Sequence, residues 1–222
     1  MIQADFGADV VGRLRQVRVV PVITIEDPVN AVPLARALAA AGLPCAEITF
    51  RTASATDALR RISAEVPEVL VGAGTILTQS QAAAAREAGA QFIVAPGFGP
   101  RVVEYCQAHA IAVFPGVATP TEIEAALETG LRTLKFFPAE PLGGLSYLKA
   151  VAAPYVDVSF IPTGGINASN VASYLAFDRV VACGGSWMAP VDWIAAKQFD
   201  RIRDESRRAL DTANGRQPAV IV

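Results

Sequence analysis

The sequence predicts an α/β fold, a single-domain (β/α)₈ TIM barrel with an extra N-terminal helix, and three observations support this prediction. Short apolar segments alternate with amphipathic, Ala-rich segments along the whole chain. The apolar segments lack alternating polarity, which is typical of parallel strands covered on both faces. Eight such segments end at steps of about 20 to 26 residues, which fits the eight βα units of a closed barrel better than a doubly wound sheet.

Each predicted strand is a short apolar segment bounded by turn residues. The eight strands are expected at residues 19–25, 45–50, 70–75, 92–96, 112–117, 133–138, 160–163 and 180–184. Helices are expected between them, with clear examples at residues 29–41, 53–65, 79–88 and 120–128. Gly42, Gly89 and Gly130 are expected to end three of these helices, because glycine readily adopts the left-handed conformation that closes a helix.

The two ends of the chain lie outside the repeating pattern. Residues 8–17 are expected to form a helix within an N-terminal segment of about residues 1–17, where it could cover the barrel floor. The segment of about residues 214–222 is apolar without a clear period, so we expect a tail. No linker divides the chain, and a single barrel domain is expected over residues 1–222.

Composition argues against several classes of function. The 222 residues are 52% hydrophobic, carry a formal net charge of -2 and have scattered basic side chains, so no nucleic-acid partner is expected. No apolar run is long enough for a membrane span, so we expect no membrane partner and a cytoplasmic location. Cys45, Cys106 and Cys183 lie in apolar context, which is typical of buried thiols in a reducing compartment. With one histidine and no metal-ligand spacing, no tightly bound metal is expected.

A lysine inside the sixth predicted strand is the first indication of chemistry. Strand periodicity places Lys135 on one face with Thr133 and Phe137. A buried ammonium loses its hydration, so this side chain must be paired, must extend to water, or must lose its proton and become a nucleophilic amine. The other two lysines, Lys149 and Lys197, lie in predicted helical segments and are expected at the surface.

Two more charged residues lie in the second predicted strand. Periodicity places Glu47 and Arg51 on one face with Cys45 and Thr49, and we expect this face to be the barrel interior. Arg51 and Lys135 fall at or near the carboxyl ends of their strands, where barrel active sites lie. A structural ion network is the alternative, but three such charges near strand ends favour an active site.

Glycine pairs follow the last two predicted strands. Gly164 and Gly165 end the seventh, and Gly184 and Gly185 end the eighth. Glycine lets backbone N–H groups approach phosphate oxygens, and a following helix end would favour an anion. These loops therefore predict a phosphate site at the place where barrels often bind one.

A further glycine-rich segment, residues 72–75, lacks the spacing of a nucleotide-binding loop. We expect it to allow close packing inside the barrel. Thr75, on the same face as Val71 and Ala73, could still form a hydrogen bond to a ligand.

Five segments resemble the bacterial 2-keto-3-deoxy-6-phosphogluconate aldolases, many of which also cleave 4-hydroxy-2-oxoglutarate. The segments are 46–52 (AEITFRT), 71–75 (VGAGT), 134–140 (LKFFPAE), 162–165 (PTGG) and 184–187 (GGSW). They occur in order over nearly the whole chain. The resemblance implies a class I aldolase and homotrimer that cleaves the six-carbon substrate to pyruvate and glyceraldehyde 3-phosphate, a step of the Entner–Doudoroff pathway.

The resemblance also implies individual roles. Lys135 would form a Schiff base with the substrate, in place of any cofactor, and Glu47 would be the acid/base. Four residues are implied to hold the pyruvate part: Arg51 and Thr75 at its carboxylate, and Pro96 and Phe137 as pocket walls. Six residues are implied at the distal hydroxyl and phosphate end: Thr163, Gly164, Gly165, Gly184, Gly185 and Ser186. The expected partner is a small-molecule keto-acid phosphate.

Three alternatives stay open at this point. An aldolase with the same chemistry could prefer 4-hydroxy-2-oxoglutarate or 2-keto-3-deoxy-6-phosphogalactonate. A non-catalytic phosphometabolite-binding barrel would use Lys135 only in an ion pair with Glu47. A metal-dependent aldolase could have a similar barrel, although a single histidine does not favour it.

Overall fold

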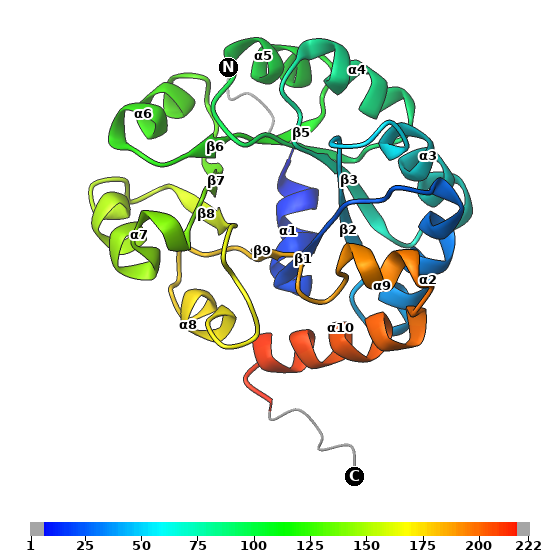
Figure 1. Ribbon diagram of the computed structural model, residues 1–222. Helices are drawn as coiled ribbons and strands as arrows, with labels where there is room; N and C mark the ends of the chain where they lie inside the picture. Colours follow the sequence, from blue (N-terminus) through cyan, green and yellow to red (C-terminus); the bar gives the residue numbers. More distant parts are fainter. Residues whose placement is uncertain (1–6, 217–222) are drawn as a thin grey trace.

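The computed structural model describes residues 7–216, and these residues form a barrel of parallel strands surrounded by helices (Figure 1). The strands are β1 (Val19–Ile23), β2 (Cys45–Thr49), β3 (Leu70–Gly74), β4 (Phe92–Val94), β5 (Ala112–Phe114), β6 (Gly116–Val117), β7 (Thr133–Phe136), β8 (Ser159–Pro162) and β9 (Cys183–Gly185). One sheet has the order β5-β4-β3-β2-β1-β9 and a second has the order β6-β7-β8. Parallel bridges Phe160↔Val180 and Thr163↔Gly184 join β8 to the β9 side. The predicted barrel is confirmed.

The fifth predicted strand, residues 112–117, is the main departure from the expected elements. It is divided into β5 and β6, with Pro115 between them. Proline has no N–H group to donate to a neighbouring strand, so the ladder is interrupted there. Several other strands end one or two residues earlier than predicted, and β1 ends at Ile23.

Helices follow the strands around the outside of the barrel (Figure 1). They are η1 (Pro28–Asn30), α2 (Ala31–Ala40), α3 (Ala55–Glu65), α4 (Gln79–Glu87), α5 (Pro100–Ala108), α6 (Pro120–Glu128), η2 (Glu140–Leu142), α7 (Gly144–Ala152), α8 (Val171–Leu175), α9 (Val191–Ala195) and α10 (Phe199–Ala213). Thr78 and Thr119 form capping boxes that satisfy the first N–H groups of α4 and α6. The predicted glycine stops Gly42, Gly89 and Gly130 all have positive φ, between 82° and 95°.

The first helix, α1 (Ala8–Val17), has the predicted bounds and lies across the centre of the barrel in Figure 1. Its Leu14 is 1% exposed and packs in one apolar cluster with Val20, Phe92 and Phe114, which point inward from their strands. Burial of these side chains closes the interior at the floor. The expectation that this helix covers the barrel floor is confirmed.

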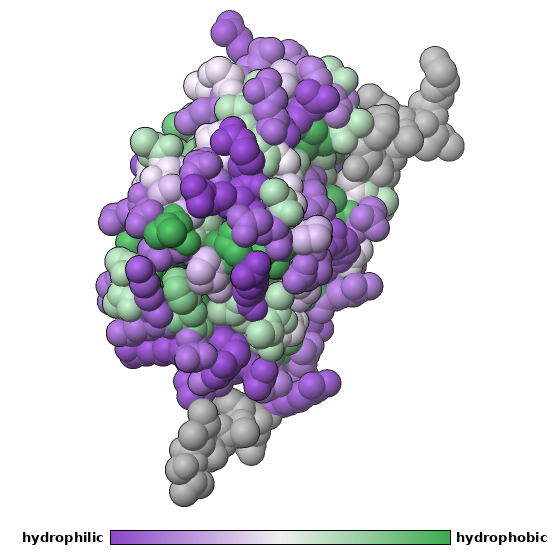
Figure 2. Space-filling view, turned by 90° about the vertical axis from the view of Figure 1, so that its right-hand side faces the viewer, coloured by the Kyte–Doolittle hydropathy of each residue, from purple (hydrophilic) through white to green (hydrophobic). Residues whose placement is uncertain are grey.

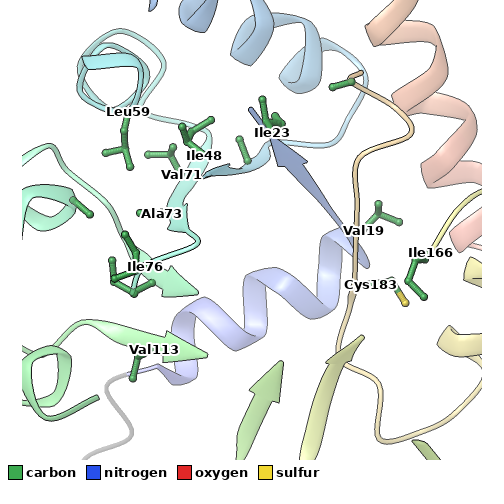
Figure 3. Close-up of a cluster of buried hydrophobic side chains, with 14 of the residues drawn as sticks. Val19, Ile23, Ile48, Leu59, Val71, Ala73, Ile76, Val113, Ile166 and Cys183 are labelled. Atoms are coloured by element: carbon green, nitrogen blue, oxygen red, sulfur yellow. The ribbon is translucent and has the colours of Figure 1, made fainter. Parts of the chain in front are cut away.

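The larger apolar cluster lies between the strands and the outer helices. Figure 3 shows Ile23, Ile48 and Val71 from three adjacent strands together with Leu59 from α3. Alternate strand residues therefore pack outward on the helices, which leaves the intervening residues to fill the interior. This alternation decides which polar side chains enter the barrel.

The outer surface differs from these layers. Figure 2 shows that the face on the side of α2 and α3 is mainly hydrophilic, with apolar side chains in small separate areas. Within residues 7–216, no helix combines the length and apolar character needed to cross a membrane.

Two predictions near the C-terminal end of the chain are not confirmed. Lys197 was expected in a helix but lies between α9 and α10, with φ of 56°. That left-handed conformation interrupts the helical path, because a side chain with a Cβ rarely continues a helix there. The predicted tail, about residues 214–222, lies outside the described residues from 217 onward.

The three thiols should react slowly in the folded protein. Cys45, Cys106 and Cys183 are free and buried, and burial raises the pKa of each to about 12. At Cys45 the nearby Glu47 charge adds to the effect. Since the thiolate is the reactive form, we expect almost no alkylation by iodoacetamide at pH 8 and complete alkylation in denaturant, measured by mass spectrometry. Rapid labelling of the native protein would contradict the described packing.

Candidate active site

The ion pair inside the barrel joins β7 to β2. Lys135 Nζ lies 3.8 Å from Glu47 Oε1, and the two side chains are 7% and 4% exposed. Leu134 and Phe136 belong to the outer apolar cluster, so the alternation of β7 directs Lys135 inward as predicted. Within the described structure, Glu47 Oε1 is buried without a hydrogen-bond partner. This carboxylate oxygen can therefore accept a proton or a hydrogen bond from a bound molecule.

The space for the Glu47 carboxylate depends on a glycine in the next strand. A Cβ atom added to Gly74 would lie 2.0 Å from Glu47 Oε1, far inside van der Waals contact. Gly72, two residues earlier, similarly faces the ring of Phe92. These contacts show the close packing inside the barrel that was predicted for this glycine-rich segment.

Arg51 and Thr75 lie together at the mouth of the barrel. Arg51 Nε donates a hydrogen bond of 3.2 Å to Thr75 Oγ1. Val71 and Ala73 pack outward with the helices, so simple alternation would direct Thr75 away from the mouth. Its φ of 58° changes the direction of the backbone after β3 and brings the hydroxyl to the arginine. The guanidinium thus keeps both terminal nitrogens free, within the described residues, for a carboxylate.

A cavity of about 470 Å³ opens above the ion pair at the carboxyl ends of the strands. Its walls include Arg51, Phe137 and Thr163, and Lys135 and Glu47 line a much smaller void of about 10 Å³. Thr163 borders both spaces, and Lys135 Nζ lies 5.0 Å from the centre of the Phe137 ring, which also borders the larger one. The amine is therefore enclosed directly beneath a cavity large enough for a small metabolite.

Two glycine loops, one after β8 and one at the end of β9, line this cavity. Gly164 and Gly165 have φ of 99° and 82°, and their N–H groups, with that of Ser186, donate no hydrogen bond within the described residues. The Gly165 carbonyl accepts hydrogen bonds from the side-chain amides of Asn167 and Asn170, at 3.2 and 3.1 Å. Free N–H groups in a concave loop can bind an anion. The helix-end contribution expected from the sequence is absent near Gly165, because α8 begins only at Val171.

Most of the predicted site residues converge. The cavity is lined by eight of them: Arg51, Phe137, Thr163, Gly164, Gly165, Gly184, Gly185 and Ser186. Lys135 and Glu47 lie below it, and Thr75 reaches it through Arg51. Pro96 is not among the lining residues. Its carbonyl instead lies against Gly116, where an added Cβ would approach it to 2.0 Å.

Sequence reasoning missed Thr24, which also lines the cavity. Val20 and Val22 point to the interior from β1, and Thr24 follows at the same period of two. A polar residue at this position, just beyond a strand end, is a signal that could have identified it. Thr24 lies 2.8 Å from Thr49 through their hydroxyl oxygens.

Comparison with known proteins gives consistent results over most of the chain. The family model described as "KDPG and KHG aldolase" matches residues 10–204. A 2-dehydro-3-deoxy-phosphogluconate aldolase of Treponema pallidum is 53% identical over 197 residues, which cover 89% of this chain and 94% of that protein.

Solved structures with the same fold include two aldolases with bound molecules. The 2-keto-3-deoxy-6-phosphogluconate aldolase of Zymomonas mobilis, solved with 3-phosphoglycerate, has a TM-score of 0.84 and 38% identity, covering 93% of this chain and 95% of that one. The KDPG aldolase of Legionella pneumophila, with pyruvate captured as a covalent carbinolamine intermediate, has a TM-score of 0.86 and 36% identity, covering 90% and 97%.

A methyl group at position 74 should displace the carboxylate of the ion pair. We expect Gly74→Ala to lower the free energy of unfolding by about 1–3 kcal/mol and to reduce turnover by at least about 10²-fold, because Glu47 can no longer occupy its present position. Gly12→Ala in α1 is a matched control, since an added Cβ there meets no atom within 4 Å. Denaturant unfolding and pyruvate release measure the two effects. Normal turnover of Gly74→Ala would contradict the assigned packing.

Proposed function

This chain belongs to the KDPG and KHG aldolase family, and we propose that it cleaves 2-keto-3-deoxy-6-phosphogluconate to pyruvate and glyceraldehyde 3-phosphate through a Schiff base on Lys135. One observation carries the proposal most directly. Lys135 Nζ is enclosed inside the barrel, 3.8 Å from a buried carboxylate and directly below the cavity. A buried amine with a carboxylate partner can serve as a nucleophile and pass protons locally.

In the first step the neutral amine of Lys135 attacks the C2 ketone of the substrate. Loss of water from the resulting carbinolamine gives an iminium ion at C2. The Arg51 fork suits the adjacent carboxylate, because two parallel charge-assisted hydrogen bonds would hold C2 at a fixed distance from the amine. Thr75 orients that fork through Arg51 Nε.

In the second step the C3–C4 bond breaks. A base removes the proton of the C4 hydroxyl, C4 becomes the aldehyde carbon of glyceraldehyde 3-phosphate, and the bonding electrons move from C3 toward the iminium nitrogen to give an enamine. Glu47 fits the role of base, because its buried Oε1 has free lone pairs beside Lys135. The same carboxyl group can return a proton to C3, directly or through water, before hydrolysis releases pyruvate and the lysine.

The phosphorylated end of the substrate is assigned to the glycine loops. The N–H groups of Gly164, Gly165 and Ser186, which donate to no other described residue, border the cavity and suit a multiply charged oxyanion. This favours a phosphorylated substrate over 4-hydroxy-2-oxoglutarate, whose distal group is a single carboxylate. Cleavage of 4-hydroxy-2-oxoglutarate is the second candidate function, since the matching family includes aldolases for that acid.

Other parts of the proposal rest on the family resemblance. Four of them stay predictions: catalysis without a metal, assembly as a homotrimer, a cytoplasmic location and a role for Pro96 as a pocket wall. None of them is needed for the steps described above. The covalent steps are assigned to the side chains of Lys135 and Glu47 beneath the cavity.

Trapping should identify the nucleophile. We expect borohydride with pyruvate to add a covalent group to the peptide that contains Lys135, because reduction fixes the imine as a stable amine. Mass spectrometry of the digested protein locates the added mass. Labelling only at Lys149 or Lys197 would contradict the assignment.

The acid/base role of the carboxylate can be tested separately. We expect Glu47→Gln to form the pyruvate imine still but to lower kcat for cleavage by about 10²–10⁴-fold, because an amide cannot exchange the proton. Pyruvate release measures turnover, and borohydride trapping measures imine formation. Unchanged turnover would remove Glu47 from the mechanism.

A further inference from the structure

Thr24 contributes a polar group to the cavity at a position to which the proposed mechanism assigns no role. It follows β1 directly, is half-buried and lines the same cavity as Arg51 and the glycine loops. Its hydroxyl oxygen lies 2.8 Å from the hydroxyl oxygen of Thr49. This contact determines whether the hydroxyl can donate a hydrogen bond to a bound molecule or only accept one.

The direction of the hydrogen bond follows from the next partner. Thr49 Oγ1 donates to the carbonyl oxygen of Ile23 at 3.0 Å, and a carbonyl can only accept. A threonine hydroxyl has a single hydrogen, so Thr49 has none left for Thr24. Thr24 must therefore donate to Thr49, and only its oxygen lone pairs remain toward the cavity. Thr49 is 1% exposed, so water does not compete at this contact.

The sheet order places this acceptor between the two ends of the proposed substrate. β1 lies between β2 and β9 in the order β3-β2-β1-β9. Arg51, at the carboxylate end, follows β2. At the phosphate end, Gly185 ends β9 and Ser186 follows it. The end of β1, with Thr24, therefore lies on the side of the cavity between Arg51 and the β9 loop. A substrate that runs along this side from Arg51 to the β9 loop would place there its hydroxyl-bearing carbon atoms between C3 and the phosphate.

We propose that Thr24 determines specificity by accepting a hydrogen bond from the C5 hydroxyl of the substrate. The inference rests on the proposed function and deepens it. 2-Keto-3-deoxy-6-phosphogluconate carries a hydroxyl donor at C5, whereas C5 of 4-hydroxy-2-oxoglutarate is a carboxylate, which has only acceptor atoms when ionised. Fixed lone pairs at Thr24 therefore favour the first acid and oppose the second. Discrimination of this kind arises when a polar group is matched in one substrate and unmatched in the other.

The test compares kcat/KM for the two acids in variants of Thr24. We expect Thr24→Val, which keeps the shape but removes the acceptor, to lower kcat/KM for 2-keto-3-deoxy-6-phosphogluconate by about five- to tenfold. Activity on 4-hydroxy-2-oxoglutarate should be unchanged or higher, so the preference ratio falls at least about fivefold. Thr24→Ser keeps the hydroxyl and should retain most of the preference. An unchanged ratio in Thr24→Val, or an equal loss in Thr24→Ser, would overturn the proposal.

A second variant tests the direction of the hydrogen bond. Thr49→Val removes the acceptor that holds the Thr24 hydrogen, so the Thr24 hydroxyl can turn its hydrogen toward the cavity. We expect kcat/KM for the dicarboxylate to rise by a few-fold, and no rise would overturn the assigned direction. Thr52→Val is the matched control: Thr52 also donates to a backbone carbonyl, that of Ile25, but does not line the cavity. Its preference ratio should equal that of the unaltered protein.

Borohydride trapping separates this inference from the function on which it rests. If the unaltered protein forms no pyruvate imine, the proposed Schiff-base function fails. If the imine forms and both acids are cleaved, but the ratio of their kcat/KM values does not change when the Thr24 hydroxyl is removed, only the specificity inference fails. The two results come from different measurements on the same preparation.

Discussion

The joint enclosure of Lys135 and Glu47 is the constraint on which the rest of the site depends. An ammonium or a carboxylate buried alone would cost several kcal/mol, so neither side chain can occupy the interior without the other. β7 and β2 place the two across the barrel, and Gly74 in β3 leaves the space that the carboxylate needs. The pair is held at 3.8 Å, longer than a hydrogen bond. Each group therefore remains available to a bound molecule, which a tighter structural ion pair would not allow.

Strand periodicity explains why so much of this arrangement could be predicted from sequence. In a parallel barrel, alternate residues face the helices and the interior, so an apolar strand that contains one charge has only one direction for it. Leu134 and Phe136 occupy the outward positions of β7, which determines the inward position of Lys135. The same argument places Glu47 and Thr49 inside from β2. The bounds of α1 could be predicted as well, because its apolar residues follow a helical period.

Periodicity alone does not determine the contacts made beyond the last residue of each strand, and the remaining features lie there. Thr75 accepts a hydrogen bond from Arg51 because its φ is positive, and a threonine in the sequence does not predict that conformation. The Gly164–Gly165 loop is oriented by amides of Asn167 and Asn170, which are local contacts without a period. The direction of the Thr24 hydrogen bond depends on Thr49, which strand pairing brings beside it and which donates to the carbonyl of Ile23. Pairing in space, rather than order along the chain, determines the Arg51–Thr75 and Thr24–Thr49 hydrogen bonds.

Residues placed by the strands and residues placed by contacts beyond the strand ends have different tasks. The first group carries the chemistry, and the second recognises the bound molecule. Strand register fixes the amine and its carboxylate, since Lys135 pairs with Gly116 and Ile161 while Glu47 pairs with Val22 and Gly72. Most recognition groups lie on the segments that follow the strands, where a change of side chain leaves the ladder intact, although Gly184 and Gly185 lie within β9. Thr24 also lies one residue past its strand, but it is bonded to Thr49 within the ladder of β2. A hydroxyl fixed by the barrel itself offers a bound molecule a single orientation, whereas a hydroxyl on a free loop could turn to suit either a donor or an acceptor.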